Sequence, residues 1–298
     1  MRSLLFVPAH DMRKLAKGLS CGADALIIDL EDSVPDAEKP RARAMCAEFV
    51  RDNRGRLPLF VRVNAPASGL MLDDLAAMVG AQPYGITLPK CSSGRDVARL
   101  DAYVSALEVR DGIRLGSLRL LPIVTESAAA LFGMPSYAHE AGPRLCAMMW
   151  GGEDLATDIG ASANRVDGVY TPPFELARSL CLFGAAAAGV VAIDAVYTDF
   201  RDLDGLRAEA RAAVAAGFGA KVAIHPGQIE TINEVFTPGD EALREAGAIV
   251  AAFAQQPGAG AVNIGGRMFD RPHLSSAQRL IARGRGEGIS QAAESREG

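Results

Sequence analysis

The stretch ADALIIDLEDSV, residues 23–34, joins an apolar run to a cluster of acids. Residues 25–28 are typical of a buried β-strand, and Asp29, Glu31 and Asp32 follow it directly. Burying an unpaired carboxylate costs on the order of several kcal/mol unless it protonates or finds a partner. We therefore expect these acids to meet cations or a metal ion where the strand ends.

Seven further apolar runs of strand length begin at Ser3, Pro58, Gly85, Leu118, Leu145, Val190 and Ala220. Segments with helical spacing lie between the runs, at residues 11–18, 39–53, 72–79, 94–109, 127–140 and 203–216. Alternation of apolar strands with helices predicts a parallel sheet covered by helices. Eight such units predict an α/β fold, a (β/α)8 TIM barrel. No GxGxxG follows the first run, which argues against dinucleotide binding.

The chain continues well beyond the eighth strand. We assign residues 1–236 to the barrel and residues 237–298 to a C-terminal helical extension. The extension either covers the barrel or docks on a neighbouring subunit. Glycine, serine and charged residues dominate residues 284–298, which predicts a disordered tail.

Composition excludes several classes of partner. Net charge is −5, and no block of lysine or arginine occurs, so we expect no nucleic-acid partner. The longest apolar stretch is short for a membrane span, and the N-terminal apolar run is short for a signal peptide. The five cysteines are scattered, with no CxxC spacing, which favours reduced thiols. We expect a cytoplasmic protein without a membrane association.

In barrels of this kind the active site lies at the carboxyl ends of the strands. Polar residues follow nearly every predicted strand: Asp29, Glu31, Asp32, Arg62, Asn64, Lys90, Thr125, Glu126, Glu153, Asp154, Asp194, Asp199, His225 and Gln228. Glu126 and Asp154 end adjacent strands, so their carboxylates can converge on Mg²⁺, which prefers one or two carboxylates plus waters and substrate oxygens. Arg62 is the candidate for gripping a carboxylate or an enolate oxygen.

Structural roles are also open for these residues. They include a helix N-cap for Asp154 or Ser127, an internal ion pair of Arg62 with Asp29 or Glu31, a solvated loop charge for Lys90 and a packed loop position for His225.

Ordered motifs give the sequence a family resemblance. LLFVPA, GADALIIDLEDSV with EKPRAR, VRVNA, LPK, PIVTES, GGEDLATDIG, AIDAVYTDFRD and AIHPGQIETINEVFTP occur along residues 3–240, and GGRMFDRPHLSSAQRLI occupies residues 265–281. They resemble the citrate lyase beta subunit family, the CitE-like branch of the HpcH/HpaI aldolase superfamily. The resemblance implies a Mg²⁺-binding barrel that cleaves a 3-hydroxy-3-carboxyacyl-CoA thioester reversibly. Substrates would be citramalyl-, malyl- or citryl-CoA, and products acetyl-CoA or a homologue plus a 2-oxo acid.

The resemblance also implies roles at the metal site. By position in the motifs, Glu126 and Asp154 are the expected metal ligands. Glu126, Gly152 and Glu153 are expected beside the substrate. Arg62 is expected to bind the 2-oxo acid and stabilise the enolate.

Two further carboxylates complete the implied catalytic set. Glu31 is expected near the metal-bound waters, and Asp270, in MFDRP, is expected to act as an acid/base over a neighbouring subunit's active site. That arrangement implies a homo-oligomer, a trimer or a hexamer.

The first loop departs from the family pattern. Many relatives have a glycine and then an acid after VP, whereas this chain has Ala9 and His10. In relatives that loop helps to hold the nucleotide of coenzyme A. Arg13 and Lys39 are the candidates for holding CoA here.

Three other activities stay open on this reading. The same site, with an added water, could hydrolyse malyl-CoA as a thioesterase. It could instead act as a CoA-independent, pyruvate-type aldolase, or serve as a subunit of a citrate lyase complex. Neither the acyl group nor the oxo acid follows from the sequence.

Overall fold

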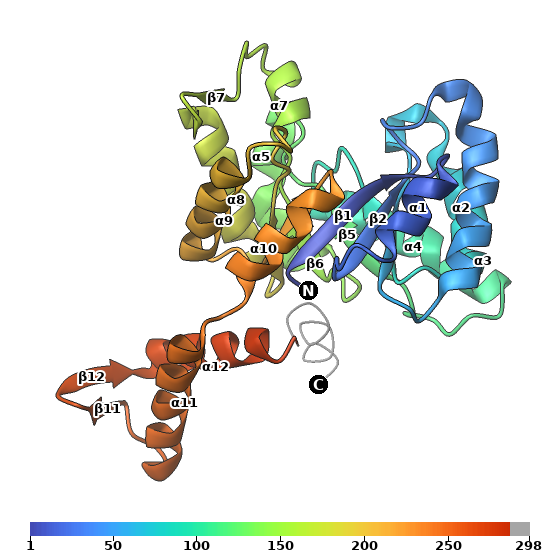
Figure 1. The fold of residues 1–298 in the computed structure, drawn as a ribbon. Coiled ribbons are helices and arrows are strands. Elements are labelled where there is room, and N and C mark those ends of the chain that lie inside the picture. Colours follow the sequence, from blue (N-terminus) through green and yellow to red (C-terminus); the bar gives the residue numbers. More distant parts are fainter. Residues whose placement is uncertain (287–298) are drawn as a thin grey trace.

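The computed structural model describes residues 1–286, and its centre is a closed parallel sheet (Figure 1). The strands are β1 (Ser3–Pro8), β2 (Ala25–Asp29), β3 (Leu59–Arg62), β4 (Gly85–Leu88), β5 (Arg119–Pro122), β6 (Ala147–Met149), β9 (Val191–Asp194) and β10 (Ala220–Ala223). Their order is β5-β4-β3-β2-β1-β10-β9-β6. Parallel bridges Leu120↔Leu145 and Ile123↔Met149 join the two outer strands, so the sheet closes. The predicted eight-stranded α/β barrel is confirmed.

Helices pack around the outside of the sheet. They are α1 (Met12–Gly18), α2 (Lys39–Asn53), α3 (Met71–Ala81), α4 (Gly94–Arg110), α5 (Ala128–Gly133), α6 (Tyr137–Glu140), α7 (Glu153–Asp158), α8 (Pro172–Ala187), α9 (Leu203–Ala216) and α10 (Ile229–Phe236), with short 3₁₀ turns η1 (Asp36–Glu38), η2 (Pro66–Ser68), η3 (Met134–Ser136) and η4 (Pro226–Gln228). The predictions for residues 39–53 and 203–216 match α2 and α9 at both ends.

The single helix predicted over residues 127–140 is wrong. The structure divides it into α5, η3 and α6. Pro135 lies in η3, and proline lacks the amide that a continuous helix requires.

The barrel has two apolar layers. Alternate strand residues, such as Ile27, Phe60 and Ile193, fill the barrel interior. Their neighbours in sequence, such as Ile28 and Val61, pack against the helices. This alternation decides where a polar residue near the carboxyl end of a strand points. It faces either the open end of the barrel interior at the carboxyl ends of the strands, here called the mouth, or the helical layer.

Two short hairpins were not predicted. One is formed by β7 (Arg165–Val166) and β8 (Val169–Tyr170), the other by β11 (Ala261–Ile264) and β12 (Arg267–Asp270). Asp167 and Gly168 turn the first with positive φ angles of 51° and 79°. Such Asp-Gly turns are the usual two-residue hairpin connections.

Residues after α10 form an extension that projects from the barrel (Figure 1). It contains α11 (Asp240–Gln255), β11, β12 and α12 (Arg271–Gly284). A separate apolar cluster, which includes Phe253 and Phe269, holds it together. The division at residue 236 stays a prediction. The disordered tail predicted for residues 284–298 also stays a prediction: Gly284 is the last residue of α12, and residues 287–298 lie outside the described part.

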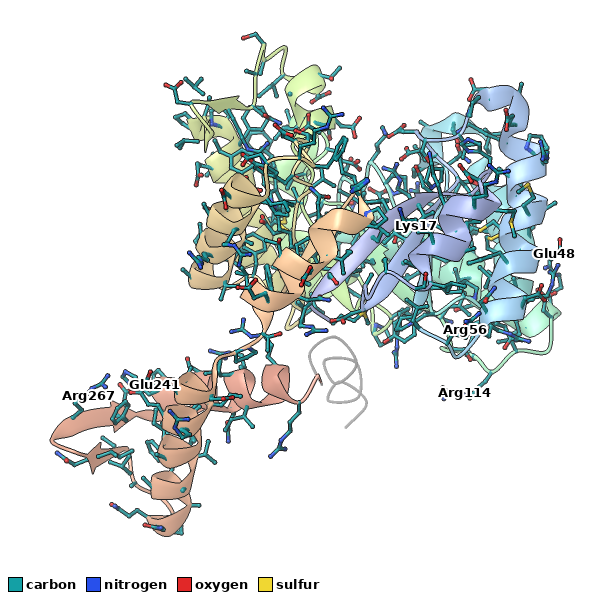
Figure 2. All side chains as sticks on the ribbon, viewed as in Figure 1. Lys17, Glu48, Arg56, Arg114, Glu241 and Arg267 are labelled. Carbon is teal, nitrogen blue, oxygen red and sulfur yellow. The ribbon has the colours of Figure 1, made fainter. Side chains whose placement is uncertain are left out.

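Charged side chains are spread over the outer surface. Figure 2 shows Lys17, Glu48, Arg56 and Arg114 on the barrel, while Glu241 and Arg267 lie on the extension. Within residues 1–286, no helix has the length and apolar character needed to cross a membrane.

Candidate active site

An ion pair between β2 and β3 begins the site at the carboxyl end of the barrel. Asp29 and Arg62 are register partners, and both continue the inward-facing set of their strands. Arg62 Nε and Nη2 donate to the two Asp29 oxygens, each at 2.7 Å. Burial opposes ionisation of Asp29, but the Arg62 guanidinium outweighs it and holds the pKa of Asp29 below its ordinary value. Asp29 therefore fixes the plane of Arg62.

The third guanidinium nitrogen of Arg62, Nη1, lies beside the other acids. It lies 3.2 Å from Glu31 Oε2 and 3.6 Å from Asp32 Oδ2. The side chain is only 12% exposed and lies over the Phe6 ring. Arg62 thus has both contacts that its sequence position suggested: it pairs inside the fold and it faces the mouth.

Lys90 crosses the mouth from β4. Its Nζ lies 3.0 Å from Glu31 Oε1 and 3.6 Å from carboxylate oxygens of Asp32 and Asp154. Its backbone N–H donates to Glu126. Burial would lower the pKa of Lys90, but the hydrogen bond to Glu31 and the nearby charges raise it. Lys90 is partly exposed on its loop, as the solvated alternative suggested, but its ammonium is also paired with the acids of the mouth.

Glu126 and Asp154 come together as predicted. Glu126 is 5% exposed, and burial, reinforced by the adjacent Asp154 carboxylate, raises the pKa of Glu126 to about 8. Asp154 belongs to the first turn of α7 with its side chain 39% exposed. It is not an N-cap, because Gly152 occupies that position. Ser127 does cap α5, accepting from the Ala130 N–H at 3.3 Å.

This donor set fits a magnesium ion. Carboxylates at the mouth, on Asp29, Glu31, Asp32, Glu126 and Asp154, outnumber the cations that pair with them, Arg62 and Lys90. Glu31 Oε2 is buried and makes no well-aligned hydrogen bond within the described chain, although Arg62 Nη1 lies 3.2 Å away. No three His, Cys, Asp or Glu residues among positions 1–286 gather closely enough to hold a metal alone. Two carboxylates plus water and substrate oxygens are nevertheless what Mg²⁺ commonly takes.

The glycine pair before α7 keeps the backbone close to Glu126. A Cβ on Gly151 would lie 3.3 Å from Glu126 Cγ. Thr125 fixes this turn, since its Oγ1 accepts from the Gly151 N–H at 2.9 Å. Gly152 follows, and Glu153 accepts from Asn164 at 2.7 Å, beside the β7–β8 hairpin. Gly152 therefore lies beside the predicted ligands, whereas Glu153 has a structural partner.

The structure places Asp270 away from these residues. It ends β12 in the extension, has a side chain 52% exposed and caps α12 together with His273. His273 is its side-chain partner within the described chain, and this hydrogen bond lowers the pKa of Asp270.

The two candidates for CoA differ. Lys39 is buried, and its Nζ donates to the carbonyls of Leu30 and Glu31 and to Asn64 Oδ1 at 2.6 Å. It holds the β2 and β3 loops together, so the suggestion that it binds CoA is not supported. Arg13 is exposed on α1, and its guanidinium has no partner in the part of the chain that the structure covers.

Asp194 was expected among the polar strand ends, but it faces the helical layer. Lys221 Nζ, Arg178 Nε and Trp150 Nε1 donate to its carboxylate at 2.7, 3.0 and 2.8 Å. Its parity on β9 is opposite to that of the interior residue Ile193, which explains the misplacement. His225 is exposed, stacks on Phe200 and caps η4, so the contacts of its side chain within the described chain are structural.

Two contributors were missing from the predicted catalytic set, Asp29 and Lys90. Strand parity could have paired Asp29 with Arg62, because both lie on the inward face of neighbouring strands. The sequence placed Lys90 at the end of a strand but gave no sign that it pairs with the acids. That pairing depends on the backbone conformation of Lys90.

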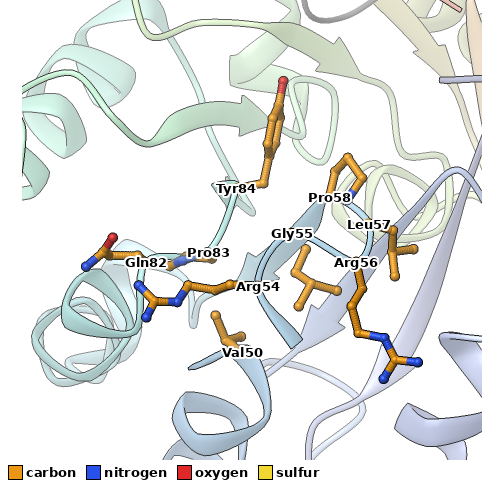
Figure 3. Close-up of a pocket in the computed structure, with 10 residues that line it drawn as sticks. Val50, Arg54, Gly55, Arg56, Leu57, Pro58, Gln82, Pro83 and Tyr84 are labelled. Carbon is orange, nitrogen blue, oxygen red and sulfur yellow. The ribbon is translucent and has the colours of Figure 1, made fainter. Parts of the chain in front are cut away.

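Two cavities lie away from the mouth. A cavity of about 420 Å³ is lined by Arg54, Pro58 and Tyr84, near the amino ends of β3 and β4 (Figure 3). A second, of about 690 Å³, is lined by Arg2, Cys21 and residues around α10. Neither includes the carboxylates at the mouth. We take the mouth as the site because its ionised side chains converge there.

Comparison with known proteins agrees with this geometry. Residues 2–226 match the model of the HpcH/HpaI aldolase/citrate lyase family. The mitochondrial citramalyl-CoA lyase of Rattus norvegicus is 36% identical over 292 residues, covering 94% of this chain and 85% of the relative. The (3S)-malyl-CoA thioesterase of Cereibacter sphaeroides is 33% identical, covering 95% and 94%.

A solved structure extends the likeness to three dimensions. CitE from Mycobacterium tuberculosis, in complex with magnesium, acetoacetate and coenzyme A, superposes with a TM-score of 0.75 at 33% identity. The match covers 95% of this chain and 97% of that one. The chain belongs to the HpcH/HpaI aldolase/citrate lyase family.

Proposed function

We propose that the protein is a Mg²⁺-dependent carbon–carbon lyase acting on a 3-hydroxy-3-carboxyacyl-CoA thioester such as citramalyl-, malyl- or citryl-CoA. The observation that carries the proposal is the convergence of Glu126 and Asp154 beside Arg62 at the barrel mouth. The name of the rat relative and the ligands of the M. tuberculosis structure support the reaction class and its cofactor.

Glu126 and Asp154 would hold the metal. When bound, Mg²⁺ supplies a Lewis acid for the carboxylate and hydroxyl or keto oxygens of the 2-oxo acid portion. Glu126 is buried, and an ionised carboxylate is costly there without a nearby positive charge. Binding of a cation beside Glu126 is therefore favourable.

Arg62 would stabilise the charge that develops on cleavage. As the carbon–carbon bond breaks, the hydroxyl passes its proton to water or to a carboxylate in the mouth, its oxygen becomes the keto oxygen, and the bonding pair forms the thioester enolate, whose carbon is then protonated. Asp29 holds two nitrogens of Arg62, which leaves Nη1 aimed at the mouth. A preoriented cation in a poorly hydrated site stabilises such charge without reorganising.

Asp270 would transfer the proton at the methyl carbon of the enolate from a neighbouring subunit. An exposed carboxylate on a projecting extension supports this arrangement. We therefore propose a homo-oligomer, a trimer or hexamer, in which the extension completes the next subunit's site.

The metal site is tested by a matched pair of variants. Glu126→Gln should lose Mg²⁺-dependent cleavage of the thioester by at least about 10²-fold, because the buried ligand is neutralised. Glu48→Gln, on the outer helix α2, removes the same charge and should stay near wild type. Full activity of Glu126→Gln with Mg²⁺, or wild-type turnover in excess EDTA, would contradict the assignment.

A second function, hydrolysis of malyl-CoA, is favoured by the (3S)-malyl-CoA thioesterase relatives. A water that attacks the thioester carbonyl of malyl-CoA in the same site would break the carbon–sulfur bond, release CoA and leave malate with its carbon–carbon bonds intact. Product analysis separates the two functions, since hydrolysis yields free CoA and a hydroxy acid. For handling CoA itself, exposed Arg13 stays our candidate.

The cellular location also stays a proposal. We place the protein in the cytoplasm because Cys46, Cys91, Cys146 and Cys181 are buried free thiols, which a reducing compartment preserves.

A further inference from the structure

Lys90 has a backbone conformation that side-chain-bearing residues rarely adopt. Its φ angle is +51°, in the left-handed region. Such a conformation persists where the surroundings determine it, and it is concentrated at functional sites. Here it directs the Lys90 N–H to the Glu126 carboxylate and the side chain back across the mouth.

The Lys90 ammonium occupies the centre of the acidic cluster. It hydrogen-bonds Glu31 Oε1 at 3.0 Å, whereas Asp154 Oδ1 lies farther away, at 3.6 Å. Lys90 and Asp154 are both 39% exposed, so neither is locked by burial. A flexible lysine can move its charge, unlike Arg62, which is held at two nitrogens by Asp29.

We infer that Lys90 is a displaceable counter-ion of the metal site. It balances the charge of Asp154 while no metal is bound, and it must release that carboxylate when Mg²⁺ binds. This inference rests on the proposed function, because it requires Glu126 and Asp154 to be the magnesium ligands. Lys90 is accordingly a positioning residue that sets metal affinity, rather than a nucleophile.

The inference has an unusual consequence. Removing a residue from the mouth should tighten Mg²⁺ binding, because the displaced ammonium carries a like charge within a few ångströms of the cation. The same removal should destabilise the metal-free protein, because the acids lose their internal partner.

Titration calorimetry of the full chain with MgCl₂ provides the test, paired with thermal unfolding in EDTA. Lys90→Met keeps an unbranched side chain and removes the charge. Its Kd for Mg²⁺ should fall roughly three- to tenfold, and its metal-free Tm should fall by several degrees. Lys90→Arg should keep the wild-type Kd within about twofold, because the charge remains. Lys17→Met, on exposed α1, controls for the loss of one positive charge elsewhere.

Each outcome decides a separate point. An unchanged or weaker Mg²⁺ affinity of Lys90→Met, with a wild type that binds Mg²⁺, overturns the counter-ion role and leaves the proposed function standing. A wild type that binds no Mg²⁺ overturns both. If Lys90→Met does not fold, Lys90→Gly replaces it, because glycine accepts the positive φ and keeps the N–H toward Glu126.

Discussion

At the scale of single residues, the mouth is an arrangement of charges that stabilise one another in pairs. Asp29 orients Arg62, while Glu31 and Lys90 hold each other beside Asp154. The carboxylates are not all compensated: burial raises the pKa of Glu126 to about 8, and burial also raises the pKa of Glu31. Arg62 and Lys90 do not fully compensate the carboxylates of the site. Binding of a further cation beside Glu126 is therefore favoured.

Replacing Asp29 with asparagine should damage both stability and catalysis. The variant leaves a guanidinium that is only 12% exposed without its buried carboxylate, which costs about 3 kcal/mol, and it frees Arg62 to turn. We expect the urea midpoint to fall and kcat to drop at least about tenfold. Asp32→Asn, at an exposed side chain 3.6 Å from Arg62, should change the urea midpoint little. Equal unfolding curves and equal kcat for wild type and Asp29→Asn would refute the orienting role.

Glu126 should give the metal-free protein a characteristic pH dependence. Its pKa is about 8 in the folded state against 4.5 as its ordinary value, so the folded state binds the proton more tightly. This contribution is present at low pH and is lost as pH rises through the folded pKa. In EDTA, the Tm of wild type relative to Glu126→Gln should therefore fall between about pH 5 and about pH 9. A constant Tm difference would show that Glu126 is ionised without cost.

At the scale of elements, tight backbone contacts decide how the loops around the mouth are built. Gly133 ends α5 where a Cβ would overlap the Ser92 carbonyl, and this contact fixes the α5–η3 corner against the loop after β4. The β7–β8 hairpin is held by Arg165, whose Nη2 donates to Glu209 of α9 at 2.8 Å.

A pair of glycine variants tests that packing. Gly133→Ala should destabilise the protein by about 1–3 kcal/mol, because backbone must shift to admit the methyl group. Gly247→Ala lies inside α11, with nothing within 4 Å, and should stabilise by about 0.5–1 kcal/mol through helix propensity. Urea unfolding measures both, and a neutral Gly133→Ala would show that the corner is loose.

The elements also show where sequence reasoning succeeds and fails. Each of the eight barrel strands was predictable because its apolar run is local. The β7–β8 hairpin was missed because its strands have two residues each, although the Asp167-Gly168 turn was readable. Asp194 and Lys39 were misplaced because strand parity turns the Asp194 side chain toward the helical layer and loop packing buries the Lys39 side chain between the β2 and β3 loops, both away from the mouth. Glu126, Asp154 and Arg62 were brought together because they end strands of one barrel.

At the scale of the whole molecule, the barrel and the extension carry different parts of the proposed site. The proposed metal ligands follow strands β5 and β6, whereas Asp270 lies in an extension with its own apolar cluster. Asp270 was the residue whose role the sequence could suggest only through resemblance, because its proposed partner surface belongs to another copy of the chain.

Sharing of the site between subunits predicts complementation. Glu126→Gln and Asp270→Asn should each be nearly inactive as homo-oligomers, and asparagine keeps the α12 cap. Co-expressed, they should form mixed oligomers in which some sites have a wild-type barrel and a wild-type extension. Thioester cleavage by the purified mixture should return to a measurable fraction of wild type. Mixed oligomers as inactive as their parents would place Asp270 outside the neighbouring site.

The most direct measurement is the identity of the products. Purified protein would be incubated with citramalyl-, malyl- and citryl-CoA, with Mg²⁺ or with EDTA, and the mixtures analysed by mass spectrometry. The lyase proposal predicts acetyl-CoA and the matching 2-oxo acid from at least one thioester, with both products lost in EDTA and in Glu126→Gln. Free CoA with an intact hydroxy acid, or no turnover of any thioester by protein that binds Mg²⁺, would contradict carbon–carbon cleavage.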